Sequence, residues 1–335
     1  MTLTVNPKVL TKKDFASDQT VRWCPGCGDY AILSTVQKVF AQLGLPREKF
    51  VVVSGIGCSS RFPYYMNTYG FHTIHGRAPA VATGIKLANP DLSVWVVTGD
   101  GDALSIGGNH LIHAARRNAD IKVLLFNNAI YGLTKGQLSP TSPRGMKTKS
   151  SPYGSVERPV NPIHLTLGAG ATFVARTVDV FQSHMAETLE AAYRHKGFAF
   201  VEILQNCVIF NHGMWFPYTE RDRRHDHVVY LEPGKPLRFG KAQEKGLVMK
   251  DGKMETVILG EDAAEEDLVV HDPSSPALAF MLGQLRDPLP VGVFYQVEQP
   301  TYEEWMYRQM EDVKRQKGKG DLKALYHAGD TWVVE

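Results

Sequence analysis

Acidic and amide side chains follow two neighbouring apolar segments of the chain, in an order that suits a metal ion. Gly99-Asp100-Gly101-Asp102 comes after the first segment, and Asn127-Asn128 ends the second. Because the carboxyl ends of parallel strands meet at one edge of a sheet, we expect these side chains to converge. Mg²⁺ prefers hard oxygen ligands, which Asp100, Asn128 and the carbonyl of Ile130 can supply beside ligand phosphates. The pattern therefore predicts a magnesium site that holds a phosphorylated ligand.

The glycines on either side of the aspartate favour the same kind of ligand. Gly99 and Gly101 allow the backbone to approach phosphate groups closely, and a helix expected to open near Ser105 would aim free amide groups at them. The order of the two segments resembles the signature of thiamine-diphosphate enzymes, in which a glycine-aspartate-glycine is followed further on by an asparagine pair. That resemblance implies the same three metal ligands.

Two other kinds of site fit these segments less well. A calcium-binding loop that starts at Asp100 would need ligands where Leu104 and Leu111 stand. A dinucleotide-binding loop at Gly55-Ile56-Gly57 would need a third glycine, and Cys58 follows instead. Gly99-Asp100-Gly101 alone is typical of an ordinary turn, and Asn127-Asn128 alone is typical of a polar strand end. The magnesium prediction therefore depends on finding both at strand ends.

The chain has four cysteines, and two residues separate Cys24 from Cys27. A short turn can aim such a pair at one metal centre. Cys58 and Cys207 each follow a predicted strand end, so all four should meet beside the magnesium site. The residues alone leave open a zinc site, a thioredoxin-like redox pair and plain buried cysteines. A place beside a cofactor favours an electron acceptor over structural zinc.

Six segments together resemble the beta subunit of 2-oxoacid:ferredoxin oxidoreductases, in that family's order. The segments are Trp23 to Gly28, Gly55 to Ser59, His75 to Ala78, Gly99 to Asp102, Asn127 to Gln137, and Cys207. The resemblance implies one 4Fe-4S cluster, with Cys24, Cys27, Cys58 and Cys207 as ligands. It also implies a thiamine-diphosphate and Mg²⁺ site made by Gly57, Cys58, Ser59, His75, Gly99, Asp100, Gly101, Asp102, Asn128, Ile130, Gly132 and Leu133.

The family's reaction takes a 2-oxoacid and coenzyme A reversibly to an acyl-CoA and carbon dioxide, and passes electrons to ferredoxin. The segment from Gly329 to Trp332 is similar to 2-oxoglutarate-specific members, which implies succinyl-CoA as product. A pyruvate-specific member is the first alternative. A thiamine-diphosphate decarboxylase or carboligase with structural zinc is the second, and a zinc-binding or thiol redox module is the third. His75 and Arg77 are expected to line the diphosphate pocket. Lys135 is a candidate for binding the substrate carboxylate, although lysines in loops are usually solvated.

Apolar runs and amphipathic segments alternate from Asp29 to about Ala199, which is typical of a parallel sheet with helices on both faces. The expected strands are Phe50 to Ser54, Leu92 to Thr98, Ile121 to Asn127 and Phe198 to Leu204. The expected helices are Tyr30 to Leu43, Ala80 to Ala88, Gly107 to Arg117 and Phe181 to His195. A long loop rich in proline is expected from Leu138 to Pro162. We therefore predict an α/β fold, with a doubly wound, mostly parallel sheet of the thiamine-diphosphate (pyrophosphate domain) type.

The chain divides into three expected regions. Residues 1–22 form an N-terminal arm, residues 23–212 form the thiamine-diphosphate domain with its cluster, and residues 213–335 form a C-terminal arm for subunit contact. Within the last region, segments on either side of Asp251-Gly252 predict a hairpin, and Glu303 to Gln316 predicts a charged helix.

We expect the chain to work with a second polypeptide. The part before Gly99 is too short to hold the first strands and also the pyrimidine-binding domain, which in these enzymes carries an activating glutamate. An alpha subunit should supply that domain, in a dimer of alpha-beta heterodimers, with ferredoxin as the external electron acceptor.

Charge and hydropathy argue against other partners. The net charge is +2 and the basic residues are spread along the chain, so we expect no nucleic-acid or membrane surface. Residues 1–18 lack a long apolar run, and we therefore expect neither a signal peptide nor a membrane-spanning segment there. We expect a cytoplasmic protein.

Overall fold

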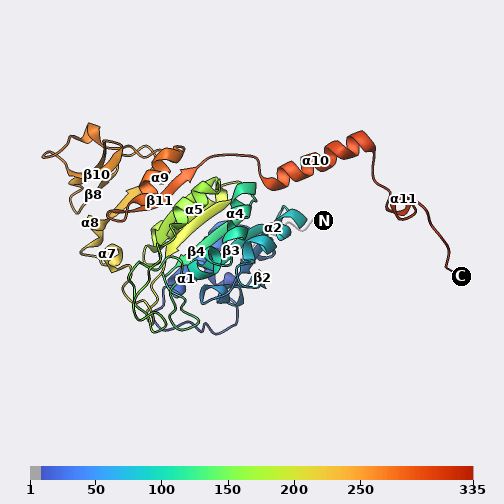
Figure 1. Ribbon diagram of the computed structural model, residues 1–335, viewed down its shortest axis with the longest axis horizontal. Coiled ribbons are helices and arrows are strands. Elements are labelled where there is room, and N and C mark those ends of the chain that lie inside the picture. The colour runs from blue at the N-terminus through green and yellow to red at the C-terminus, as the bar shows by residue number, and fades with distance from the viewer. Residues whose placement is uncertain (1–8, 335) are drawn as a thin grey trace.

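Eight strands form one mostly parallel sheet in the computed structural model, which describes residues 9–334. The strand order is β2-β1-β3-β4-β6-β5-β11-β7, and among the pairs only β11 and β5 run antiparallel (Figure 1). The strands are β1 (Phe50–Ser54), β2 (Tyr69–His72), β3 (Ser93–Gly99), β4 (Lys122–Asn127), β5 (Phe173–Val178), β6 (Ala199–Leu204), β7 (Val228–Leu231) and β11 (Leu289–Gln296). The predicted fold class is confirmed.

Helices cover both faces of this sheet because successive residues of each strand point to opposite sides. Phe50 and Val52 pack on the face covered by α1 and α6, whereas Val51 and Val53 pack on the face covered by α2, α4, α5 and α9. The helices are α1 (Asp29–Gln42), α2 (Ala78–Ala88), α3 (Asp100–Leu104), α4 (Gly108–Arg117), α5 (Pro162–Gly168), α6 (Gln182–Arg194), α7 (Phe216–Thr219), α8 (Arg224–His227), α9 (Pro276–Gln284), α10 (Tyr302–Lys317) and α11 (Leu322–Tyr326).

The four predicted strands and four predicted helices of the sheet region are all present, with ends within two residues of those expected. The prediction that a helix begins near Ser105 was wrong. α3 begins earlier, at Asp100, and ends at Leu104. The break before α4 follows from a close crossing, since a Cβ on Gly107 would lie 2.5 Å from the carbonyl oxygen of Asp102 and 3.0 Å from the Cα of Gly76. A continuous helix has no room for that crossing.

The predicted loop and hairpin are also present. No helix or strand occupies residues 138–161, which connect β4 to α5. A second, three-stranded sheet contains β8 (Arg238–Phe239), β9 (Lys245–Lys250) and β10 (Lys253–Ile258). Asp251 (φ 48°) and Gly252 (φ 73°) close the β9–β10 hairpin in the left-handed region that a tight hairpin turn requires.

The C-terminal helices leave the body of the molecule as an arm, which we define as residues 301–334 (Figure 1). Its first two turns are fixed to the body. The buried Glu303 carboxylate accepts from the backbone N–H of Asp120 at 3.2 Å, Glu304 pairs with Lys196, and the Tyr307 hydroxyl donates to a carbonyl of α2 at 2.8 Å. The arm also exposes large apolar side chains: Trp305, Met310, Val313, Leu322, Leu325, Tyr326, Trp332, Val333 and Val334.

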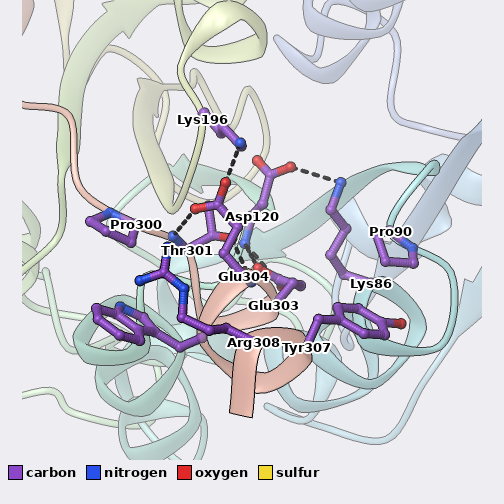
Figure 2. A pocket seen from close by; sticks show the side chains of 11 residues that line it. Lys86, Pro90, Asp120, Lys196, Pro300, Thr301, Glu303, Glu304, Tyr307 and Arg308 are labelled. Carbon is purple, nitrogen blue, oxygen red and sulfur yellow. Dashed lines mark hydrogen bonds and ion pairs between the residues drawn. The ribbon is translucent and has the colours of Figure 1, made fainter. Parts of the chain in front are cut away.

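A cavity of about 520 Å³ lies where the arm meets the body, at the edge where β3 and β4 begin (Figure 2). Its charged side chains pair with one another, as Lys86 does with Asp120 at 2.7 Å and Lys196 with Glu304. The Lys196–Glu304 pair joins the arm to the body, and the cavity lies at the opposite edge of the sheet from the predicted cofactor site. None of the described helices is long and apolar enough to cross a membrane.

Candidate active site

The carboxyl ends of β1, β3 and β4 surround a cavity of about 150 Å³. Asp100, at the start of α3, and Asn128 and Ile130, after β4, all line it. So do the other positions predicted to bind the cofactor: Gly57, Cys58, Ser59, His75, Gly99, Gly101, Asp102, Gly132 and Leu133. The structure thus brings these residues together around one cavity.

The chemistry of this lining fits a hard cation. Asp100 is 2% exposed, and burial raises its pKa to about 6 although Ser139 (2.5 Å) and Thr141 (2.6 Å) donate to one of its oxygens. A nearby divalent cation would favour the charged form of such a carboxylate. The Asn128 side-chain oxygen accepts a backbone N–H from Ile130 at 3.1 Å and has a second lone pair for a metal. Carboxylate, amide and carbonyl oxygens make a suitable set for Mg²⁺.

Asp102 connects the loops around the cavity. Its buried carboxylate accepts from the Thr98 hydroxyl at 2.6 Å, from the backbone N–H of Ile56 at 3.0 Å and from that of Gly76 at 2.7 Å, and His75 also contacts it. These bonds occupy both carboxylate oxygens. Asp102 therefore supports the cavity wall.

All four cysteines line a second cavity, of about 450 Å³, which adjoins the first. Cys24 is exposed, and the other three are half-buried. The indole N–H of Trp23 donates to the carbonyl of Cys58 at 2.7 Å and holds the two cysteine loops together. The predicted meeting of Cys24, Cys27, Cys58 and Cys207 beside the diphosphate site is therefore observed.

The two cavities share five residues: Asp29, Cys58, Asn128, Gly132 and Leu133. A Cβ on Gly132 would lie 3.5 Å from the Cys58 sulfur and 3.6 Å from the Cys207 sulfur. The backbone that follows the predicted metal ligand Ile130 therefore lies close to two cysteines that are distant in sequence.

Two of the four thiols have a raised pKa. Burial, and then the Asp29 charge, raises the pKa of Cys58 to about 12, and the same causes raise the pKa of Cys27. Burial and the neighbouring Asp179 charge raise the pKa of Asp29 itself to about 7. Among the described residues, no group of three or more His, Cys, Asp or Glu side chains is placed to hold a single metal ion. A cubane cluster presents four separate irons, so its thiolates need not converge on one point.

Gln205 is a site residue that the sequence analysis missed. It is 1% exposed at the end of β6, its side-chain oxygen accepts from Asn128 Nδ2 at 2.8 Å, and its Nε2 donates to the Cys27 sulfur at 3.2 Å. One amide thus connects the predicted metal loop to the cysteines. Its place two residues before Cys207 was the only local signal.

Lys135 lines the cysteine cavity, next to the shared residues, and its φ is 77°. Arg77, which we expected beside the diphosphate, does not line either cavity. Its guanidinium donates to the carbonyl oxygens of His75 and Ile106 at 3.3 and 3.0 Å, so it supports a loop from outside.

Comparison with known proteins assigns the fold and the family. Residues 55–203 match the family described as thiamine pyrophosphate enzyme, C-terminal TPP binding domain. The chain is 52% identical over 331 residues to 2-oxoglutarate oxidoreductase subunit KorB of Mycobacterium tuberculosis, covering 96% of this chain and 88% of that one. This chain belongs to the beta subunits of the 2-oxoacid:ferredoxin oxidoreductases.

Two further relatives of this beta subunit agree. The 2-oxoacid:ferredoxin oxidoreductase subunit beta of Sulfolobus sp is 40% identical over 285 residues, covering 84% of each chain. A solved structure of 2-oxoglutarate:ferredoxin oxidoreductase from Magnetococcus marinus, with 2-oxoglutarate, coenzyme A and succinyl-CoA bound, superposes with a TM-score of 0.77 at 36% identity, over 96% of this chain and 97% of that one. The family predicted from the sequence is confirmed, and the beta subunit is part of an oxidoreductase.

Proposed function

We propose that this beta subunit acts in the reversible, coenzyme A-dependent oxidative decarboxylation of 2-oxoglutarate to succinyl-CoA and carbon dioxide, with electrons passed to ferredoxin. The observation that carries the proposal is the pair of adjoining cavities, one lined by hard oxygen donors and the other by four thiols. The names of the relatives in Mycobacterium tuberculosis and Magnetococcus marinus support 2-oxoglutarate as the substrate.

The first cavity would hold thiamine diphosphate through Mg²⁺. Asp100, Asn128 and the carbonyl of Ile130 would be the metal ligands, and Gly99 and Gly101 would let the backbone approach the diphosphate. When bound, thiamine diphosphate supplies the electron sink that decarboxylation of a 2-oxoacid requires. Gly101 also provides space for Tyr131, because a Cβ there would lie 2.3 Å from that ring.

The second cavity would hold one 4Fe-4S cluster, with Cys24, Cys27, Cys58 and Cys207 as its ligands. Gln205 would donate to a ligand sulfur and hold Asn128 at the same time. Lys135, at the junction of the cavities, would meet the substrate carboxylate, and His75 would line the diphosphate pocket.

The remaining parts of the proposal concern assembly. An alpha subunit would supply the pyrimidine-binding domain with its activating glutamate, in a cytoplasmic dimer of alpha-beta heterodimers. Residues 213–335 would form the region for subunit contact, with residues 23–212 as the cofactor domain and residues 1–22 as an N-terminal arm, of which residues 1–8 lie outside the described part. The apolar side chains exposed on the arm support this assignment.

The test is an anaerobic assay of the beta subunit produced together with its alpha subunit. We expect reduction of ferredoxin that requires both 2-oxoglutarate and coenzyme A, with a lower kcat/KM for pyruvate. The isolated beta subunit should be inactive but brown, and dithionite should bleach its visible absorption. A colourless protein with bound zinc would overturn the cluster assignment, and preference for pyruvate would overturn the substrate.

A further inference from the structure

Three polar side chains lie within an apolar layer of the sheet. Arg176 on β5 and Glu202 on β6 are direct partners across the strands, each 2% exposed, and Asn127 ends β4 on the same face at 3% exposure. Their strand neighbours Val174 and Leu125 belong to the apolar core. Removing ionised groups from water is costly, so a buried ion pair is weak evidence for stability alone.

The contacts run from this ion pair to the metal loop. Arg176 Nε donates to Glu202 Oε2 at 2.7 Å, and Asn127 Nδ2 donates to Glu202 Oε1 at 2.7 Å. A carboxylate can only accept, so it fixes which end of the Asn127 amide faces it. The Asn127 oxygen must then face the other way, where it accepts from the backbone N–H of Ala129 at 3.1 Å and lies 2.9 Å from the Thr141 hydroxyl, whose single proton it shares with Asp100.

Both of those contacts control the predicted metal ligands. Ala129 stands between Asn128 and Ile130 with φ at 54°, a left-handed conformation that disfavours a residue with a side chain. Its N–H bond to Asn127 helps to hold that conformation. Thr141 lies against Asp100, 2.6 Å from its carboxylate. The orientation of the Asn127 amide therefore affects all three predicted metal ligands.

We propose that Glu202, with Arg176 as its counter-ion, is a positioning residue that preorganises the magnesium loop through the Asn127 amide. This inference rests on the proposed magnesium site. Neither charged side chain touches the ligands, and Glu202 acts by fixing the direction of the amide. Arg176 neutralises the buried carboxylate and is itself held by the Pro290 carbonyl and the face of the Phe294 ring.

The Glu202→Gln variant tests the direction of the amide. Gln has one acceptor oxygen, which the cationic Arg176 will take, so that its NH₂ group faces Asn127. The Asn127 amide must then turn over, and its oxygen leaves Ala129 and Thr141. We expect the assembled alpha-beta enzyme to bind Mn²⁺ with thiamine diphosphate at least about tenfold more weakly, as electron paramagnetic resonance of free Mn²⁺ would measure.

Two further variants separate positioning from folding. In Arg176→Met/Glu202→Gln, the Gln oxygen is free to face Asn127, and we expect Mn²⁺ affinity to return to within about threefold of the unchanged enzyme. Glu202→Asp keeps the charge but shortens the side chain by one methylene, and it should also weaken Mn²⁺ binding. It provides the test in case Glu202→Gln does not fold. Val174→Ala, on the same face, is the control that lowers the melting temperature without changing Mn²⁺ affinity.

Each outcome decides between the proposals. If Glu202→Gln and Glu202→Asp lower only the melting temperature and leave Mn²⁺ affinity unchanged, the positioning role is wrong. It is also wrong if the double variant binds Mn²⁺ no better than Glu202→Gln. If the unchanged enzyme binds no Mn²⁺ with thiamine diphosphate, or Asp100→Asn binds it equally well, the proposed magnesium site itself fails.

Discussion

The side chains nearest the proposed cofactors are held by neighbours that have no ligand role. Ser139 and Thr141 hold Asp100, Asp102 connects three loops, and Gln205 bridges the metal loop and a cysteine. Such supporting contacts typically change metal affinity by 10- to 100-fold when removed, roughly as much as some ligands do. Function at this site therefore depends on several buried hydrogen bonds outside the ligand set.

Gln205→Leu should affect both proposed cofactors at once. The variant loses the bond to Asn128 and the bond to the Cys27 sulfur, while the apolar side chain fills the same buried space. We expect about tenfold weaker binding of thiamine diphosphate with Mg²⁺ and a lower cluster midpoint potential, because hydrogen bonds to sulfur stabilise the reduced form. Calorimetry and a redox titration measure the two effects. Gln182→Leu, on the exposed start of α6, is the control.

Cys207→Ser should remove the visible chromophore and leave the diphosphate site in place. A hydroxyl is a poor substitute for a thiolate ligand of iron. We expect the iron content and the dithionite-bleachable absorption to fall several-fold, with thiamine diphosphate binding unchanged within about threefold because no oxygen donor is altered. Val208→Ala, which alters the same cavity, should keep its colour. Full iron content in Cys207→Ser would contradict the ligand assignment.

At the scale of the elements, the apolar strand segments and the amphipathic helices were predictable because burial on two faces needs continuous apolar runs. β5 was missed since Arg176 interrupts its apolar pattern, and only the partner Glu202 on β6 makes that charge tolerable. The break after α3 was missed because it depends on Gly76, which is distant in sequence from Gly107. The segments at Gly55, Gly99, Asn127 and Cys207 were predictable because each follows a strand end, whereas Ser139, Thr141 and Gln205 gain their roles only from long-range contacts.

Glu303→Ala should loosen the first turn of α10. The variant leaves the N–H of Asp120 without its carboxylate partner, which costs about 1–3 kcal/mol at a buried position. We expect amide hydrogen exchange in residues 302–309 to rise at least about tenfold, the rate change that corresponds to 1.4 kcal/mol. Exchange in β3 and β4 should not change. If exchange in residues 302–309 is the same in the variant as in the unchanged protein, the Glu303 carboxylate does not hold the arm.

His195 should make the end of α6 sensitive to acid. Burial, and then the charge of Lys122, lowers the pKa of His195 to about 4, and its ring lies 2.8 Å from the Thr172 hydroxyl. The folded state disfavours the proton, so this contribution is complete above pH about 6.5, the ordinary histidine value, and is lost as pH falls towards 4. It amounts to roughly 3 kcal/mol at most.

His195→Gln keeps a hydrogen-bonding group beside Thr172 and cannot gain that proton. Its unfolding free energy should therefore vary less between pH 6.5 and 4 than that of the unchanged protein, as denaturant titrations at several pH values would measure. His113→Gln, on the exposed side of α4, should leave the pH dependence unchanged. A variant with the same slope as the parent protein would assign the acid sensitivity to other groups.

At the scale of the whole molecule, the cavity at the carboxyl ends of β1, β3 and β4 lies at the opposite edge of the sheet from the cavity where the arm meets the body. Removing residues 301–335 should therefore weaken co-purification with the alpha subunit, because the exposed apolar side chains are lost. Cluster content and thiamine diphosphate binding should be kept, since no residue that lines either proposed cofactor cavity is removed. Truncation after Lys317 keeps α10 and tests the tail alone. Undiminished co-purification after the longer truncation would place the subunit contact elsewhere.

The boundary between the two cavities is thin at Gly132, which lines both of them. The backbone there has no side chain, both cavities reach it, and an added Cβ would lie within 3.6 Å of the Cys58 and Cys207 sulfurs. Because the same glycine lines both cavities, an electron could pass between groups bound in them without an intermediate redox-active group. The driving force and the reorganisation energy would then set the rate together with the distance, so a change in the lining of either cavity could alter this step.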